Sequence, residues 1–286
     1  MEIERVGVIG CGTMGSGITQ VCAQAGYEVL VSEANNELLN KGLAAVDSSL
    51  LKAIEKGKLS PDDKNSVRAR IKGTVDKRDF YDCDLVIEAA PENMELKRQI
   101  FSELDNVCPK HAILATNTSS LSVIDIATAT TRTDKVLGLH FFNPVPAMKL
   151  LEVVKTIVTS DETLETGKEF GKSIGKTVIV APDVPGFILN RLMAPLGINA
   201  IRMLEDGIAT KEDIDNAMKL GANMPMGRLE LADLIGLDTL LAGYENLYQQ
   251  LKDPRYAPPL LLKKMVAAGW LGRKSGKGFY EYKKED

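Results

Sequence analysis

An apolar run that leads into a glycine-rich turn near the N-terminus constrains the fold of this chain more than any other stretch. Gly10, Gly12 and Gly15 have the spacing G-x-G-x-x-G and precede a helical pattern. In this arrangement the first glycine forms a tight turn, the second lets a pyrophosphate approach the backbone, and the third packs the helix on the strand. Thr13 and Met14 lie in the first helical turn, where unpaired backbone N–H groups attract phosphate. The pattern predicts a β-α unit that binds a dinucleotide.

The residues that follow strengthen this prediction. The helix is expected to end at Gly26, and residues 27–32 read as a second strand that ends in Glu33. An acid about 20 residues after the glycines is placed to accept hydrogen bonds from a ribose, and it would repel a 2′-phosphate. Residues 34–36 offer no arginine to hold such a phosphate, so NAD is favoured over NADP. The alternative is a β-turn-α unit without a nucleotide, because glycine-rich turns recur in a chain with 24 glycines.

Composition excludes several classes of protein. With 286 residues, 44% of them hydrophobic and 26% charged, the chain is long enough for two globular domains. The net charge of −4 gives no excess of basic residues that would attract nucleic acid or an anionic membrane surface, and we expect neither as a partner. We expect no signal peptide, because the first residues lead directly into a predicted strand, and no apolar stretch approaches the roughly 20 residues that cross a bilayer. Four scattered cysteines and two histidines indicate a cytoplasmic protein with reduced thiols and no metal site.

Polar residues follow two further predicted strands. Residues 84–90 form a compact apolar strand, and Ala90, Glu92 and Lys97 lie at or just after its end. Residues 112–115 form the next strand, which leads into the polar run 116–120 with Ser119 near its end. Ligands of a doubly wound sheet bind beyond the carboxyl ends of its strands, so these side chains are expected near the cofactor. Helix capping explains part of the polar run, but five consecutive hydroxyl or amide residues exceed what a cap requires.

His140 lies near the end of a strand predicted over residues 136–142, and Glu152 lies inside an apolar strand predicted over residues 149–154. The turn between them is short, so the two strands are expected to pair antiparallel and to bring the two side chains together. A lone histidine in a strand is more often a core residue, but a lone buried carboxylate is costly. Together they are interpreted as a dyad in which the acid orients the imidazole.

The helix predicted over residues 35–58 projects Ser49, Lys52 and Lys56 from one side. This face could hold phosphates. From the residues alone we favour the alternative, in which this face of the helix is exposed to solvent and its lysines bind no ligand.

A change of pattern divides the chain. Residues 181–186 read as a linker, and beyond them the pattern is wholly helical, with a long apolar helix over residues 187–205. The expected fold is α/β: a Rossmann-type, doubly wound, mostly parallel sheet over residues 1–185, followed by an all-helical domain over residues 186–286. A helix that is apolar on much of its surface needs several partners, which predicts a homodimer or an assembly of dimers.

Short motifs along almost the whole chain resemble those of the L-3-hydroxyacyl-CoA dehydrogenase family, most of all its short bacterial 3-hydroxybutyryl-CoA dehydrogenases. Besides the glycine turn, they are N-T-S-S at 117–120, H-F-F-N-P at 140–144, P-G-F at 185–187 with N-R at 190–191, P-M-G at 225–227 and G-K-G-F-Y at 276–280. The resemblance implies hydride transfer between NAD(H) and C3 of a short-chain 3-hydroxyacyl-CoA. The expected pair is 3-hydroxybutyryl-CoA and acetoacetyl-CoA, in fatty acid and butyrate metabolism.

The resemblance also assigns roles to residues. His140 matches the catalytic base, Glu152 its partner, Ser119 the serine that contacts substrate and cofactor, and Asn190 an asparagine of the helical domain that closes the active site. The positions that bind the dinucleotide correspond to Glu33, Glu92, Lys97, Asn143 and Lys274. Ser49 and Lys56 match positions that contact coenzyme A, which reverses the preference for a helix face that binds no ligand.

Two other functions would also fit a Rossmann domain followed by helices. An oxidative decarboxylase of the β-hydroxyacid dehydrogenase class also joins a Rossmann domain to helices. Such enzymes carry a lysine four residues before the asparagine, where this chain has Gly186. The second rival is a non-catalytic relative that keeps NAD binding, and the joint presence of His140, Glu152, Ser119 and Asn190 argues against it.

Overall fold

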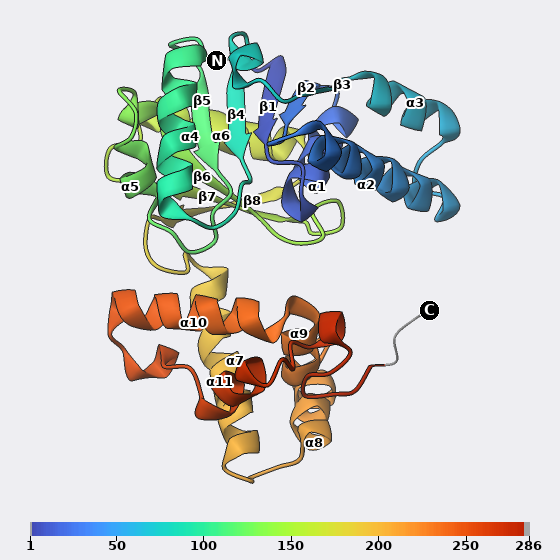
Figure 1. Cartoon of the computed structure of the whole chain (residues 1–286), viewed down its shortest axis with the longest axis vertical. Helices are drawn as coiled ribbons and strands as arrows, with labels where there is room; N and C mark the ends of the chain where they lie inside the picture. The colour runs from blue at the N-terminus through green and yellow to red at the C-terminus, as the bar shows by residue number, and fades with distance from the viewer. Residues whose placement is uncertain (1, 283–286) are drawn as a thin grey trace. The chain divides into compact units, whose positions relative to one another are not determined.

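The computed structural model describes residues 2–282 of the chain, which divide into two compact units, Met1–Val184 and Pro185–Asp286 (Figure 1). The first unit is built on one eight-stranded sheet with the strand order β3-β2-β1-β4-β5-β6-β7-β8. The strands are β1 (Arg5–Ile9), β2 (Glu28–Ser32), β3 (Ile71–Thr74), β4 (Leu85–Glu88), β5 (Ile113–Thr116), β6 (Val136–Phe141), β7 (Leu150–Lys155) and β8 (Thr177–Pro182).

Every neighbouring pair of strands is parallel except β6 and β7, which run antiparallel. This confirms the mostly parallel, doubly wound sheet and the antiparallel pair that the short turn predicted. The strand order reverses between β1 and β4, because β2 and β3 extend the sheet from one side of β1 and β4 to β8 extend it from the other. A reversal of this kind is where open α/β sheets bind their ligands.

Helices cover both faces of the sheet, with α4 and α6 on opposite sides (Figure 1). The helices of this unit are α1 (Thr13–Gln24), α2 (Asn36–Glu55), α3 (Pro61–Ala69), α4 (Met94–Val107), α5 (Val123–Ala127) and α6 (Asp161–Ser173). Their starts follow the expected capping chemistry: Asn35 caps α2, and Ser60 forms a capping box with Asp63 at α3. One core cluster joins α1 and α6 to the sheet, where Tyr27 packs on Phe170 with ring centroids 5.6 Å apart.

Two local features differ from the sequence-based expectations. The strand β3 was not predicted, because its four residues are too few to show an alternating pattern. The linker expected at 181–186 is wrong for its first residues, because Ala181 and Pro182 continue β8 beside β7. Asp183 then accepts hydrogen bonds from the backbone N–H groups of Val123 and Ile124 at 3.0 and 2.7 Å, so it caps the start of α5.

The second unit contains helices and has its own apolar core. Its helices are α7 (Leu189–Glu205), α8 (Lys211–Asn216), α9 (Arg228–Ile235), α10 (Leu237–Leu251) and α11 (Leu260–Ala267), with a π-helical turn at Ala217–Gly221. Two fully buried carboxylates, Asp215 and Asp233, fasten its loops by accepting backbone N–H groups. Among residues 2–282, no helix combines the length and the apolarity needed to cross a membrane.

Candidate active site

The glycine turn between β1 and α1 has the geometry of a phosphate cradle. Gly10 has a φ of +91°, and a Cβ at Gly15 would lie 1.8 Å from the carbonyl oxygen of Gly10, so both positions require glycine. At Gly12 an added Cβ would meet nothing within 4 Å. This open space lies at the N-cap of α1, beside the first-turn residues Thr13 and Met14. The turn therefore fits the pyrophosphate of a dinucleotide bound at the positive end of the helix.

Glu33 is fixed against this turn. Its Oε1 accepts a hydrogen bond from the backbone N–H of Cys11 at 2.7 Å, and its Oε2 accepts one from Ala34 at 3.1 Å. A carboxylate fixed there fits the hydroxyl groups of an adenosine ribose.

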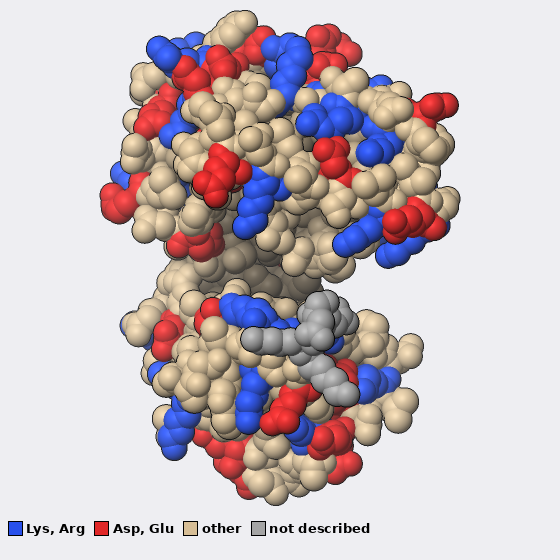
Figure 2. Space-filling model, turned by 45° about the vertical axis from the view of Figure 1, so that its right-hand side comes forward, with Lys and Arg blue, Asp and Glu red and all other residues tan. Residues whose placement is uncertain are grey.

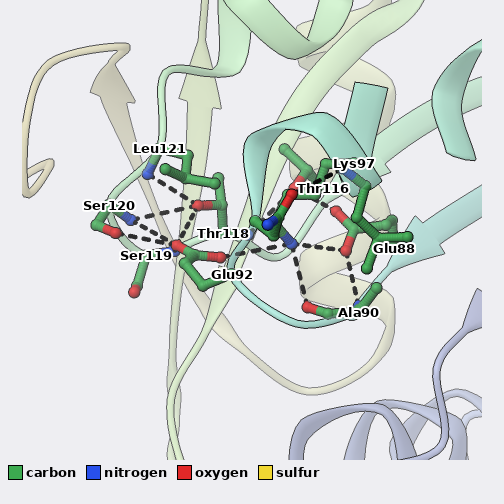
Figure 3. Close-up of polar contacts among 11 residues, drawn as sticks. Glu88, Ala90, Glu92, Lys97, Thr116, Thr118, Ser119, Ser120 and Leu121 are labelled. Atoms are coloured by element: carbon green, nitrogen blue, oxygen red, sulfur yellow. Dashed lines mark hydrogen bonds and ion pairs between the residues drawn. The ribbon is translucent and has the colours of Figure 1, made fainter. Parts of the chain in front are cut away.

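The ends of β4 and β5 hold a connected network of polar groups (Figure 3). Ala90 follows β4, and Lys97 of α4 is 1% exposed with its ammonium 2.6 Å from a carboxylate oxygen of Glu88. Glu92 accepts hydrogen bonds from the turn that carries Ser119. Burial by itself would raise the pKa of Glu92, but the ammonium of Lys97 and these hydrogen bonds outweigh it and lower that pKa below its usual range. Glu92 therefore stays ionised at neutral pH.

The strand pair β6 and β7 brings His140 directly opposite Glu152. The Nδ1 atom of the imidazole lies 2.6 Å from Oε2 of Glu152, and the two side chains are 5% and 0% exposed. The ring of Phe142 packs against the imidazole with a centroid distance of 4.4 Å. A carboxylate at this distance favours the tautomer of the imidazole that carries its proton on Nδ1. The predicted pairing of the two side chains is therefore confirmed.

The remaining predicted positions lie in three other places. Asn143 is exposed in the turn after β6, and Ser49 and Lys56 lie at α2, where Ser49 is half-buried and Lys56 is the exposed C-cap. In the helical unit Asn190 lies in the first turn of α7. Lys274 lies 2.6 Å from a carboxylate oxygen of Asp238.

Two polar residues of the site were not identified from the sequence, and only the first of them carries a signal that could have been used. Glu88 is fully buried at the end of β4, so it is an acid inside an apolar strand, the same signal that pointed to Glu152. Asn117 accepts the backbone N–H of Phe141 at 3.0 Å through its side-chain oxygen, and so ties the end of β5 to the strand that bears His140. That second contact joins residues 24 apart and has no local signature in the sequence.

Comparison with known proteins agrees with this geometry. Residues 5–184 match the family described as 3-hydroxyacyl-CoA dehydrogenase, NAD binding domain, and residues 186–282 match its C-terminal domain. The 3-hydroxybutyryl-CoA dehydrogenase of Clostridioides difficile is 47% identical over 98% of this chain and 100% of its own length.

Solved structures match both units at once. The (S)-3-hydroxybutyryl-CoA dehydrogenase PaaH1 from Ralstonia eutropha has a TM-score of 0.96 at 46% identity, and FadB2 of M. tuberculosis has a TM-score of 0.97 at 44% identity. Each match covers 99% of this chain and 100% of the other. Because the family matches span both units and these relatives match along their entire length, this chain belongs to the 3-hydroxyacyl-CoA dehydrogenase family.

Proposed function

We propose that the protein is an NAD-dependent dehydrogenase that interconverts 3-hydroxybutyryl-CoA and acetoacetyl-CoA, in fatty acid and butyrate metabolism. The observation that carries the proposal is the buried contact of 2.6 Å between His140 and Glu152, in a member of this family. Relatives that match the whole chain are named for this reaction, which supports a four-carbon acyl group.

In the proposed reaction His140 removes the proton of the 3-hydroxyl group through Nε2, because Nδ1 is engaged by Glu152. Bound nicotinamide supplies the chemistry of hydride exchange with C3 of the substrate. Glu152 stabilises the positive charge that the imidazole gains, and in the reverse direction the imidazolium returns the proton. Ser119 and Asn190 are proposed to hydrogen-bond substrate oxygens, and Ser49 and Lys56 to contact coenzyme A. General acid-base help of this kind contributes about 10²–10⁴ in rate.

Replacing His140 by Gln tests the mechanism. We expect the rate of acetoacetyl-CoA reduction to fall about 10²–10⁴-fold, because the general acid-base group is lost. In Glu152→Gln the same rate should fall about 10²-fold, because the imidazole loses the carboxylate that orients it. The Kd for NADH should change little in both variants. His111 is the other histidine, 55% exposed and paired with Asp84, so His111→Gln is the matched control and should keep normal turnover. Near-normal turnover of a folded His140→Gln variant would remove the imidazole from the mechanism.

NAD is the proposed cofactor, with NADP disfavoured. The carboxylate of Glu33 would repel a 2′-phosphate, and none of residues 34–36 is basic. The ratio of kcat/KM for NADH and NADPH measures this preference. A ratio in favour of NADPH would contradict the proposal.

We also propose a cytoplasmic homodimer, which could assemble further. The compartment is indicated by four buried free thiols, as expected of a protein in a reducing environment: Cys11, Cys22, Cys83 and Cys108.

The dimer is indicated by apolar side chains on α7. Leu192, Leu196 and Met203 are 63%, 41% and 39% exposed, and their spacing places them on one stripe of the helix. An exposed apolar stripe of this kind is typical of a subunit interface. The face drawn in Figure 2 carries acidic and basic side chains interspersed. With a net charge of −4, we propose neither nucleic acid nor a membrane surface as a partner.

A further inference from the structure

We propose that Lys176 is a positioning residue, whose buried ammonium holds the turn at residues 142–149 in the conformation that presents Asn143 to the dinucleotide. This turn joins β6 to β7, so it begins two residues after His140 and ends three residues before Glu152. The inference rests on the proposed function and extends it, because it assigns a residue that controls the affinity for the cofactor.

The turn leaves the edge of the sheet at which the dinucleotide is proposed to bind. β4, β5 and β6 are parallel, so their carboxyl ends lie along one edge, and ligands of such sheets bind beyond it. On its other side the turn packs on α1, because a Cβ added at Gly17 would lie only 2.8 Å from the Cβ of Val145. Gly17 lies four residues after Thr13, the first residue of α1. The turn therefore borders the proposed site both from the sheet and from the helix of the phosphate cradle.

Few buried contacts hold this turn. Residues 143–149 are exposed except for Val145, which is 2% exposed. Inside the turn the backbone N–H groups of Ala147 and Met148 both donate to the carbonyl oxygen of Pro144, at 3.0 Å each. A segment with so few buried contacts opens at a low free energy. Its conformation therefore depends on the groups that fasten it to the rest of the unit.

Lys176 supplies such a fastening from the segment between α6 and β8. Its Nζ atom donates to the carbonyl oxygen of Val145 at 2.6 Å and to that of Met148 at 2.8 Å. The residue is 9% exposed. Next to it the backbone N–H of Thr177 donates to the carbonyl oxygen of Lys149 at 2.7 Å. One side chain thus holds the middle of the turn at two points, and the start of β8 holds its end.

A lysine is costly to bury at this position. Lys176 is bonded to carbonyl oxygens rather than to a carboxylate, and burial lowers the pKa of its ammonium. An apolar side chain of similar length would avoid this desolvation, but it would leave two carbonyl groups of the turn without their donor. The lysine therefore serves the conformation of the turn more than the packing of the core.

Asn143 is the residue of the turn that can use this fastening. It is exposed, and it lies two residues before Val145, whose carbonyl oxygen the ammonium binds. An asparagine offers one acceptor and two donors, which fit the carboxamide and the ribose hydroxyl groups of a nicotinamide nucleotide. Because a side chain that is already held loses less entropy when its ligand binds, restraining the turn raises the affinity for the cofactor.

Lys176→Met tests the inference, with Lys172→Met as the matched control. Lys172 is an exposed lysine in the last turn of α6. In Lys176→Met we expect the Kd for NADH to rise about tenfold, while the KM for acetoacetyl-CoA at saturating NADH stays within about threefold. Hydrogen exchange of the Ala147 and Met148 amides should accelerate about tenfold, because the turn that protects them opens more often. The control should match the wild type in all three measurements.

An Asn143→Ala background shows whether the lysine acts through the asparagine. In that background Lys176→Met should raise the Kd for NADH less than about threefold, since residues that act as one unit are not additive. Gly17→Ala displaces the same turn from the side of α1, and it replaces Lys176→Met in the test if that variant does not fold. It should raise the Kd for NADH about tenfold alone and less than about threefold in the Asn143→Ala background.

A folded Lys176→Met variant with the wild-type Kd for NADH would overturn the inference. So would an equal rise of that Kd with and without Asn143, because the lysine would then act on the cofactor by another route. Failure of the proposed function has a different signature. In that case the wild-type protein binds NADH but does not reduce acetoacetyl-CoA, and the amide exchange and the Kd for NADH still decide the role of Lys176.

Discussion

Single side chains decide how the glycine turn works, because an added methyl group would have opposite consequences at two glycines only three residues apart. At Gly15 it would collide with the carbonyl oxygen of Gly10, whereas at Gly12 it would enter open space. Gly15 is therefore required by packing. Gly12 keeps space clear at the N-terminus of α1, where a phosphate is proposed to bind.

Substituting the two glycines separates these roles. Gly12→Ala should unfold at nearly the wild-type temperature, because its φ of −72° suits alanine, while its Kd for NADH rises about tenfold as the methyl group obstructs the phosphate. Gly15→Ala should lose more than about 3 kcal/mol of stability through overpacking against backbone. Thermal unfolding and NADH fluorescence titration measure both. A Gly12→Ala variant with unchanged NADH affinity would contradict the proposed phosphate position.

The thiols predict a dependence of stability on alkaline pH. Burial raises the pKa of Cys22 from 9.0 to about 12, and burial with the nearby carboxylate of Glu33 raises that of Cys11 to about 11. Above pH 9 the unfolded chain therefore loses thiol protons that the folded protein keeps, and the free energy of unfolding falls as the pH rises from 9. Urea titrations at pH 8 and pH 10 measure this loss. Cys22→Ala should show a smaller loss, and an equal one would contradict the assignment.

For single residues, the sequence predicted which side chains carry the chemistry better than it predicted which side chains contact one another. His140 and Glu152 were identified because an acid inside an apolar strand needs a partner, and the turn between the strands was short enough to supply one. The same reasoning applied to Glu88 would have marked it as paired. It could not have identified Lys97 as the partner, because that pairing depends on how α4 packs over the sheet.

Among the contacts between elements, a buried carboxylate on α9 holds the segment at residues 278–282 in place. Asp233 of α9 is 1% exposed and accepts the backbone N–H groups of Phe279 and Tyr280 at 2.9 and 2.8 Å, and the hydroxyl of Tyr282 at 3.0 Å. A Cβ at Gly278 would lie 2.0 Å from this carboxylate. The G-K-G-F-Y motif is therefore the part of the chain that wraps around Asp233.

Asp233→Asn should loosen this fastening. The amide keeps the shape but presents N–H groups to N–H donors, and leaving buried donors unpaired should cost about 2 kcal/mol of unfolding free energy. Trp270, the single tryptophan, lies in the same unit and reports its unfolding by fluorescence in urea. Glu245→Gln is the control, because its ion pair with Lys263 is about half exposed and should contribute little. Equal stability of both variants would contradict this role for Asp233.

At the scale of the whole molecule, two units with separate cores carry different parts of the proposed activity. The sheet unit contains the glycine turn, the His140–Glu152 pair and the turn of Ser119, and the helical unit contains Asn190 and the exposed stripe of α7. Among residues 2–282 this stripe is exposed, and most homo-oligomers close as twofold dimers, so the stripe is our proposed contact surface for a second subunit.

A charge placed on this stripe should prevent assembly. Leu192→Lys is expected to yield a monomer, because burying an unpaired ammonium in an apolar interface costs more than the leucine contributed. Light scattering coupled to size-exclusion chromatography measures the mass. Ile157 is 94% exposed in the sheet unit, so Ile157→Lys is the control and should leave the assembly unchanged. A dimeric Leu192→Lys protein would place the interface elsewhere.

Local patterns in the sequence predicted most of the helices and strands, the glycine turn and the residue types of the site, because all of these depend on neighbours close along the chain. Packing of the folded chain sets which distant groups meet. It placed β3 at the edge of the sheet, made β8 continue through Pro182, and enclosed Lys97 between Glu88 and Glu92. Such contacts depend on strand register and helix packing, which bring together residues that carry no local signal of one another.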